Sequence, residues 1–143
     1  MGEVVTPDGE WQRPLPVLDE VNGPYWSAAA QGRLLIQECA ACGHRQFYPR
    51  ALCAQCGGEP GWLECSGSGT VHTFTVVRQM GMRPFRDELP YVVAMVELEE
   101  GPRMMGNVTD CDPDTVRIGL PVEAHFVRAA DDVGVPMWRP ASG

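Results

Sequence analysis

Four of the six cysteines form two Cys-x-x-Cys-Gly motifs, with ten residues between Cys42 and Cys53. Two thiolates that are two residues apart can reach one ion from a single tight turn, and the glycine after each pair allows the positive φ of such a turn. Four thiolates fill the tetrahedral coordination of Zn²⁺ and leave no open position. The spacing therefore predicts one structural zinc ion per chain, held by Cys39, Cys42, Cys53 and Cys56.

Two other uses of these motifs compete with zinc. Cys-x-x-Cys-Gly turns also hold iron in rubredoxin-like electron carriers, and the spacing does not separate the two metals. Disulfides are disfavoured because the N-terminus lacks the basic start and apolar stretch of a secretory signal, so we expect a cytoplasmic protein with reduced thiols. Cys65 and Cys111 lie outside the motifs and are expected to be small buried apolar residues.

The charge of the chain limits its partners. Nineteen acidic residues against eleven basic ones give a net charge of −8, and all the basic residues are Arg. Such a chain repels a polyphosphate backbone, which disfavours nucleic-acid binding, and without Lys it has no Schiff-base chemistry. Arg can still bind a small phosphate ligand through paired hydrogen bonds. No apolar run approaches the roughly 18 residues of a membrane span, so we expect no membrane partner.

The residues of nucleophilic catalysis form no recognisable set. The histidines His44, His72 and His125 fall in the ribbon or in predicted strands, and no Ser-His-Asp arrangement is evident. His44 lies next to the first cysteine motif, but four thiolates already complete a zinc site. We therefore expect no intrinsic catalysis.

The elements around the cysteines can be predicted from the pattern. Residues 1–21 have no sustained periodicity and predict an extended arm, in which the apolar segment 15–18 is expected to lie against a surface. A helix is predicted from Asn22-Gly23-Pro24 to Gly32, with Tyr25 and Trp26 on one face, packed on the ribbon or on a partner. A strand at 33–38 leads into the first motif. We expect domain boundaries at 1–21, 22–66 and 67–143.

The chain after Gly67 has the texture of an all-β domain. Thr70 to Arg78 alternates in period two, which is typical of a half-buried strand. Five or six short strands without a strong helix predict a small closed barrel, and with Greek-key order an OB-fold, so that the chain is mainly β. The further predicted strands are 91–98, 103–108, 116–118, 121–128 and 133–138.

An ordered set of motifs carries a family resemblance from about residue 15 onward. Besides the two cysteine motifs, the set is Tyr25-Trp26, Gly32-Arg33-Leu34, Phe47-Tyr48-Pro49-Arg50, Gly69-Thr70-Val71, Pro90-Tyr91, Val116-x-Ile118-Gly119 and Pro136-Met137-Trp138-Arg139-Pro140. It resembles a family in which a rubredoxin-like zinc ribbon is joined to an OB-fold. That family was long catalogued as a domain of unknown function and is now described as acyl-CoA-associated.

The resemblance implies a non-catalytic subunit that accompanies a thiolase-like enzyme. Relatives lie beside thiolase-fold enzymes, and sometimes beside or fused to hydratases, in acyl-CoA and steroid side-chain metabolism. Similar domains accompany a thiolase-like aldolase that releases a short acyl-CoA, and some hold the CoA part of the substrate. This sequence carries no hydratase domain, so we expect either a free-standing subunit or a truncated piece of a longer protein. Two alternatives stay open: a module that binds single-stranded nucleic acid, and an iron-dependent electron carrier.

Recognition of CoA and of the partner calls for particular side chains. CoA brings three phosphate groups and an adenine ring, which need Arg forks and flat apolar surfaces. Such residues occur on the ribbon and in the loop after the first barrel strand, and aromatic residues are the expected partner contacts. The candidates for CoA are Phe47, Tyr48, Arg50, Arg83, Phe85 and Arg86, and those for the partner are Tyr25, Trp26 and Trp138.

Overall fold

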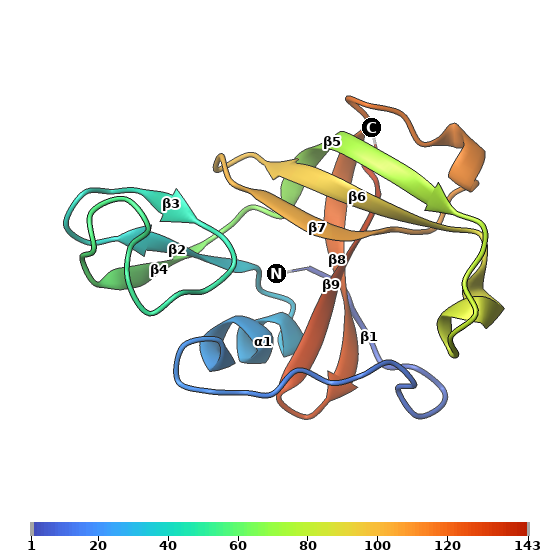
Figure 1. Ribbon diagram of the computed structural model, residues 1–143, viewed down its shortest axis with the longest axis horizontal. Helices are drawn as coiled ribbons and strands as arrows, with labels where there is room; N and C mark the ends of the chain where they lie inside the picture. Colours follow the sequence, from blue (N-terminus) through green and yellow to red (C-terminus); the bar gives the residue numbers. More distant parts are fainter. Residues whose placement is uncertain (1, 143) are drawn as a thin grey trace.

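The computed structural model describes residues 2–142 and consists of a ribbon, a barrel and one helix that lies against the barrel (Figure 1). Among these residues no helix is long and apolar enough to cross a membrane. The elements in chain order are β1 (Val4–Val5), α1 (Gly23–Ala30), β2 (Leu35–Cys39), β3 (Arg45–Gln46), β4 (Pro60–Glu64), β5 (Ser68–Val77), η1 (Phe85–Glu88), β6 (Tyr91–Leu98), β7 (Arg103–Val108), η2 (Pro113–Thr115), β8 (Pro121–Ala130) and β9 (Val133–Pro140).

The barrel closes through five strands. Its strands pair in the cyclic order β5-β6-β7-β9-β8 and back to β5, and only the β7–β9 pair, at Val108 and Trp138, is parallel. Closure of this kind leaves no free sheet edge, and the strand order is that of an OB-fold. The predicted mainly β chain with an OB barrel is therefore confirmed. A separate antiparallel sheet in the order β3-β2-β4 forms the ribbon.

The barrel core is built around Trp138, the largest of the fully buried side chains. Its indole lies against Gly106 of β7, where a Cβ atom would be only 2.9 Å from the ring. Trp138 has no exposed surface. The expectation that Trp138 contacts a partner is therefore wrong for this conformation, because the apolar ring is used to fill the barrel.

A bulge interrupts the alternation predicted for β5. The pairing register with β6 shifts between Val71 and Thr73, so one extra residue is inserted at His72. Val71 points into the core, but beyond the bulge Phe74 and Val76 are the side chains that pack against it. The uninterrupted alternation expected from 70 to 78 is therefore wrong, because the extra residue exchanges the two faces.

The strand predicted at 116–118 is a loop. The Asp112 carboxylate accepts a hydrogen bond from the amide of Asp114 at 2.9 Å and starts the short η2 helix in front of it. Gly119 then turns the chain with a φ of +88°. A segment bounded by these two turns is too short to extend, although its first residue, Val116, is still buried in the core.

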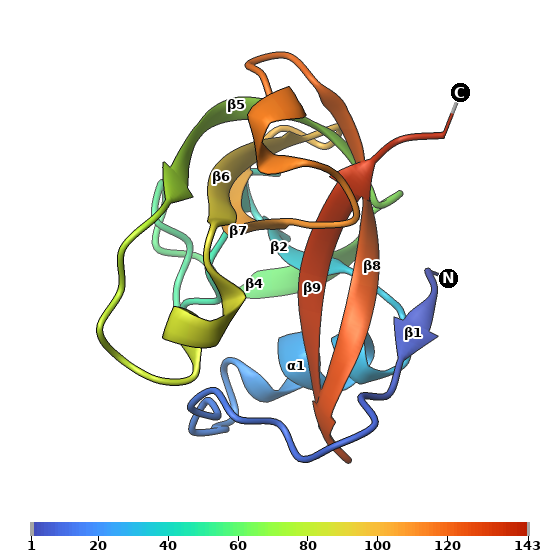
Figure 2. The same cartoon turned by 90° about the vertical axis from the view of Figure 1, so that its right-hand side faces the viewer.

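The arm and α1 both dock on the β8–β9 hairpin (Figure 2). Val4 and Val5 of the arm pair in parallel with β8. The helix, confirmed close to its predicted bounds, approaches β9 so closely that Gly134 has no room for a Cβ atom, which would lie 2.2 Å from the Ala29 carbonyl carbon. The helix also contacts β2 of the ribbon, so its packing is shared between the barrel and the ribbon.

Candidate metal centre and contact surfaces

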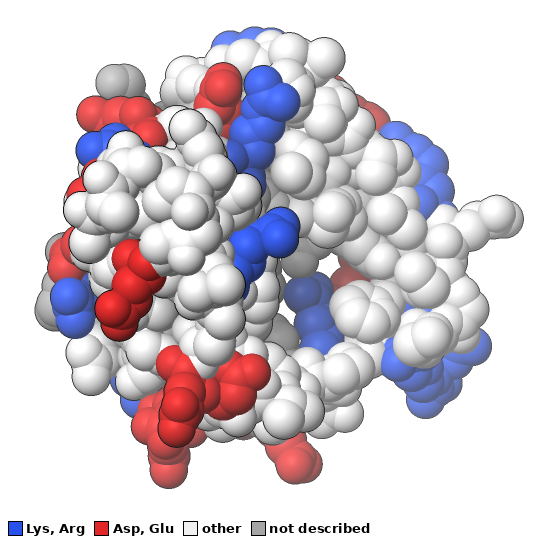
Figure 3. Space-filling model, turned by 60° about the vertical axis from the view of Figure 1, so that its left-hand side comes forward, with Lys and Arg blue, Asp and Glu red and all other residues white. Residues whose placement is uncertain are grey.

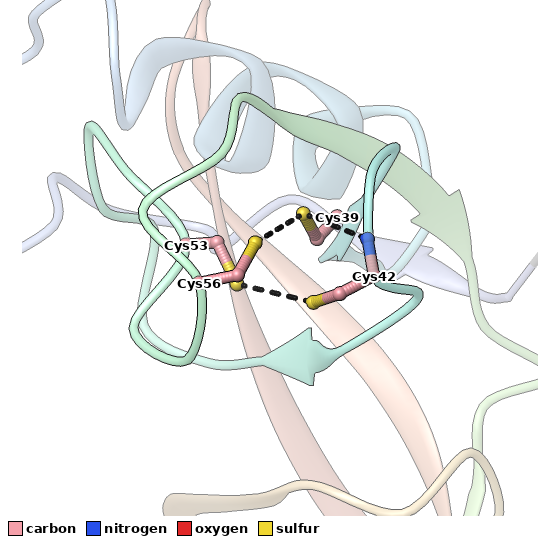
Figure 4. Close-up of side chains that lie close together, drawn as sticks. All are labelled: Cys39, Cys42, Cys53 and Cys56. Atoms are coloured by element: carbon pink, nitrogen blue, oxygen red, sulfur yellow. Dashed lines mark hydrogen bonds between the residues drawn. The ribbon is translucent and has the colours of Figure 1, made fainter.

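The four motif cysteines converge at one end of the ribbon (Figure 4). Their sulfur atoms all lie within 4.8 Å of one another, with 3.5 Å between Cys39 and Cys56 and 3.7 Å between Cys42 and Cys53. Zinc–sulfur bonds of about 2.3 Å at tetrahedral angles place sulfurs about 3.8 Å apart, so the cluster has the right size for a four-thiolate zinc ion. All six cysteines of the chain are free, and these separations are far longer than a disulfide bond.

The two cysteine turns have the same construction. Gly43 and Gly57 each adopt a φ of +76°, the left-handed conformation that glycine takes without strain. Their amides donate to the carbonyl oxygens of Cys39 and Cys53, at 2.9 and 3.0 Å. Each turn therefore presents its two sulfurs from one closed backbone loop.

Backbone amides point at the sulfurs and favour negative charge on them. The amide of Cys42 donates to Cys39 Sγ at 3.5 Å and lowers the pKa of Cys39 to about 6. The Gly58 amide acts on Cys56 in the same direction, but thiol hydrogen bonds to the neighbouring sulfurs outweigh it and raise the pKa of Cys56 to about 12. The hydrogen bonds of the protein alone thus favour the thiolate at Cys39 and the thiol at Cys56. A divalent cation would displace the remaining protons, which fits the donor set to zinc.

Two buried glutamines, missed by the sequence analysis, support the second cysteine turn. The Gln37 amide bonds both the N–H and the carbonyl of Arg50, each at 2.9 Å. Gln46 Oε1 accepts from the Ala54 amide at 2.9 Å, and its Nε2 donates to Gln37 Oε1 at 2.8 Å. Gln37 in the otherwise apolar strand pattern of residues 34–37 was the available signal, because a buried amide must find partners.

An aromatic cluster joins α1 to the ribbon. The rings of Tyr25 and Phe47 are 5.3 Å apart, and Trp26 Nε1 donates to the hydroxyl of Tyr48 at 3.0 Å. Tyr25 is only 3% exposed, and its burial raises the pKa of its phenol. The expectation that Tyr25 contacts a partner is therefore wrong for this conformation, because the cluster itself covers the ring. Trp26 is half-buried and Tyr48 is exposed, so both keep surface for a partner.

The candidates for CoA binding fall into two sets that do not meet. The set at 47–50 lies on the ribbon, whereas Arg83, Phe85 and Arg86 belong to the β5–β6 loop (residues 78–90), at the opposite end of the long axis (Figure 1). All three arginines of the two sets are exposed. One face of Phe85 is already covered by Arg13, whose guanidinium carbon lies 5.1 Å from the ring centroid. Figure 3, in which the ribbon side of the molecule comes forward, shows arginine side chains around a hollow.

The hydroxyl–imidazole pair that the fold brings together belongs to the barrel wall. Thr109 Oγ1 lies 2.9 Å from His125 Nε2, and the Thr109 amide and hydroxyl are both directed to the carbonyl of Trp138. His125 is 7% exposed, and burial lowers its pKa. The pair joins His125 of β8 to Thr109, which directly follows β7, so its geometry is that of a structural contact.

Comparison with known domain families assigns both halves of the chain. Residues 26–60 match the family described as the rubredoxin-like zinc ribbon domain of ChsH2, and residues 62–127 match its C-terminal OB-fold domain. A DUF35 domain-containing scaffold protein of Methanocaldococcus jannaschii is 40% identical over 101 residues, which are 69% of this chain and 71% of that protein.

Larger proteins and a solved complex are also similar. A probable enoyl-CoA hydratase alpha subunit of Thermomonospora curvata is 38% identical over 131 residues, but the match spans 90% of this chain and only 40% of that protein. The solved structure described as the Ltp2-ChsH2(DUF35) aldolase contains a chain with a TM-score of 0.80 and 36% identity. That match covers 90% of this chain and all of the other.

Proposed function

Because this chain belongs to the DUF35 family, with the zinc ribbon and OB-fold of ChsH2, we propose that it is a non-catalytic scaffold subunit of an acyl-CoA enzyme. The partner we propose is a thiolase-like aldolase that cleaves a steroid side chain and releases a short acyl-CoA. The subunit stabilises this enzyme and helps to bind the CoA part of its substrate.

One observation carries the proposal. The match to a chain of the aldolase structure covers 90% of this chain, so it takes in both the ribbon and the barrel. In a scaffold the relative placement of the domains matters as much as the fold of each domain, because the partner binds the surface that they form together. The names of the DUF35 relatives, which call them scaffold proteins, agree with this role.

The candidate partner surface that we propose combines exposed apolar side chains of the arm and of the ribbon. Leu15 and Val17 of the arm are 52% and 87% exposed, and Leu52 of the ribbon is 60% exposed. Trp26 and Tyr48 bridge helix and ribbon between them. Apolar and aromatic side chains on a rigid support are the usual energetic anchors of an interface. This surface replaces the buried Tyr25 and Trp138 as the proposed contact.

Co-purification tests the scaffold role. The chain is co-expressed with a thiolase-like aldolase, and we expect a stable complex that cleaves acyl-CoA substrate while the isolated chain does not. Val17→Asp should weaken the complex at least tenfold, since burying an unpaired carboxylate in an interface is costly. Thr75→Asp, on an exposed strand position of the barrel, is the matched control. Turnover by the isolated chain would refute the non-catalytic assignment.

The CoA contribution is tested separately, by kinetics of the complex. Loss of a charge-assisted hydrogen bond to a phosphate costs about 1.5–3 kcal/mol, which corresponds to a KM for acyl-CoA raised about 10- to 100-fold. The phosphates lie far from the reacting carbon, so kcat should stay nearly unchanged. We propose Arg50→Ala, Arg83→Ala and Arg86→Ala as variants. A wild-type KM in all three would mean that the partner alone binds CoA.

A hydratase is the second candidate partner, because two larger relatives bear hydratase alpha subunit names. The same co-expression, made with a hydratase subunit in place of the thiolase-like enzyme, distinguishes the two. Hydration of an enoyl-CoA by that pair, without complex formation by the thiolase-like enzyme, would favour this candidate.

A further inference from the structure

The N-terminal arm passes beside the β5–β6 loop and contacts it through Arg13. The guanidinium carbon lies 5.1 Å from the Phe85 ring centroid and 5.6 Å from that of Trp11, within the range of cation–π attraction. The same group donates to Asn107 Oδ1 of β7 at 3.0 Å and to both carboxylate oxygens of Glu88, at 3.1 and 3.2 Å. One side chain thus joins the arm, the loop and the barrel.

Apart from the contact with Arg13, Phe85 of the loop packs on Tyr91 of β6, with 6.2 Å between the ring centroids. The backbone hydrogen bonds of residues 79–89 lie within the loop: the Arg86 amide donates to the Met82 carbonyl, and the Asp87 amide donates to the Pro84 carbonyl. Within the described residues 2–142, the hydrogen bonds between residues 79–89 and the rest of the chain are those of Arg13 with Glu88. Through its hydrogen bonds, the placement of the loop therefore depends on Arg13, a residue far away in the sequence.

The arm is fixed on both sides of Arg13. Before it, β1 is paired with β8, and Phe126 donates its amide to the Glu3 carbonyl at 2.9 Å. After it, the Asn22 side chain donates to the Val17 carbonyl at 3.1 Å. Between these anchors the arm lines one side of a groove of about 470 Å³, and Val127 and Met137 of the barrel line another. Arg13 is consequently presented to the loop from a held segment.

We infer that Arg13 is a positioning residue that holds the β5–β6 loop, with Arg83 and Arg86, in a defined place on the barrel. The side chain suits this role because a planar guanidinium can stack on aromatic rings and donate to an amide and a carboxylate at once. The side chain of Arg13 is 19% exposed and that of Glu88 is 45% exposed, so solvent partly screens their ion pair, and the stacking and the hydrogen bond to Asn107 add to it. The consequence for acyl-CoA kinetics, but not the positioning itself, rests on the proposed function.

Hydrogen exchange on the zinc-loaded chain tests the positioning. In Arg13→Ala we expect the two hydrogen-bonded amides of the loop, those of Arg86 and Asp87, to exchange about tenfold faster, because the variant loses both the stacking and the ion pair. In Glu88→Gln exchange of the same amides should be about threefold faster, because this variant removes the carboxylate charge but keeps the stacking of Arg13 on Phe85. Arg117→Ala, which removes an exposed arginine outside the loop, is the control and should change nothing in these residues. Thermal melting confirms that each variant is folded.

Kinetics of the complex then separate this inference from the proposed function. If the loop positions CoA contacts, Arg13→Ala raises the KM for acyl-CoA and leaves kcat unchanged. Faster exchange with an unchanged KM supports the positioning role and argues against a CoA contact in this loop. Unchanged exchange in folded Arg13→Ala overturns the inference, even where Arg83→Ala raises KM and the proposed function stands.

Discussion

The close approach of α1 to β9 makes Gly134 a sensitive position. A Cβ atom on residue 134 would lie 2.2 Å from the Ala29 carbonyl carbon and 2.3 Å from the Ala30 nitrogen. Carbon contacts are normally near 3.5 Å, so in Gly134→Ala the helix must withdraw by about 1.3 Å. Backbone atoms cannot rotate away as a side chain does. The helix must therefore move as a unit.

The cost can be worked out from the contacts that this movement disturbs. Overpacking costs about 1–3 kcal/mol, and a backbone obstacle places Gly134→Ala at the upper end of that range. Withdrawal also stretches the hydrogen bond from Arg128 Nη2 to the Ala30 carbonyl, now 2.8 Å. We expect the free energy of unfolding to fall by about 3 kcal/mol. For a chain of this size the melting temperature then falls by about 10 °C.

The assay is thermal melting with zinc present, compared with Gly81→Ala. A Cβ atom on residue 81 meets no atom within 4 Å, so this control removes the same glycine freedom without a clash. It should leave the melting temperature unchanged or raise it slightly, through the lower entropy of the unfolded chain. If Gly134→Ala melts within about 2 °C of Gly81→Ala, the helix does not approach β9 as closely as described.

Three further predictions concern the ribbon and the barrel. Elemental analysis should give one equivalent of zinc in the wild-type protein and in Cys65→Ser, whereas Cys53→Ser should lose the zinc and melt at a much lower temperature; a visible spectrum of iron in the wild-type protein would contradict zinc. Below about pH 6.5 protonation favours the unfolded state, because burial lowers the pKa of His125 in the folded state. The free energy of unfolding should therefore decrease as the pH falls below this value. The decrease should be less steep in His125→Gln and should stay as in the wild-type protein in the control His72→Gln. Tyr48→Phe removes the acceptor of the Trp26 indole and should cost about 1 kcal/mol in urea unfolding; an unchanged midpoint would show that this hydrogen bond adds nothing.

Local signals in the sequence were enough to predict most of the elements. The cysteine spacing, the glycine after each pair and the proline at the start of α1 act within a few residues, so the ribbon and the helix could be placed from sequence. The strands 91–98 and 103–108 were predicted with the bounds that the structure has. The bulge at His72 could not be predicted, because it depends on which residue of β6 lies opposite.

Burial was harder to predict than secondary structure. Tyr25, Trp26 and Trp138 are all large aromatic residues, and nothing local separates a core residue from a surface anchor. Trp138 is buried because Gly106, far away in the sequence, leaves space for its ring. The contact of Arg13 with Glu88 was missed for the same reason, since it joins the arm to a loop that the chain forms much later.

The docking of β1 and α1 on the β8–β9 hairpin has a consequence for the order of assembly during synthesis. All four zinc ligands leave the ribosome within one short stretch, so the ribbon can bind its metal early. The arm and the helix emerge before it, but their docking surface is made last. Contacts between such distant segments form slowly, and until then the apolar face of α1 is open to other chains. The arm and α1 are translated before the ribbon and the barrel, and are thus expected to reach their native positions after them.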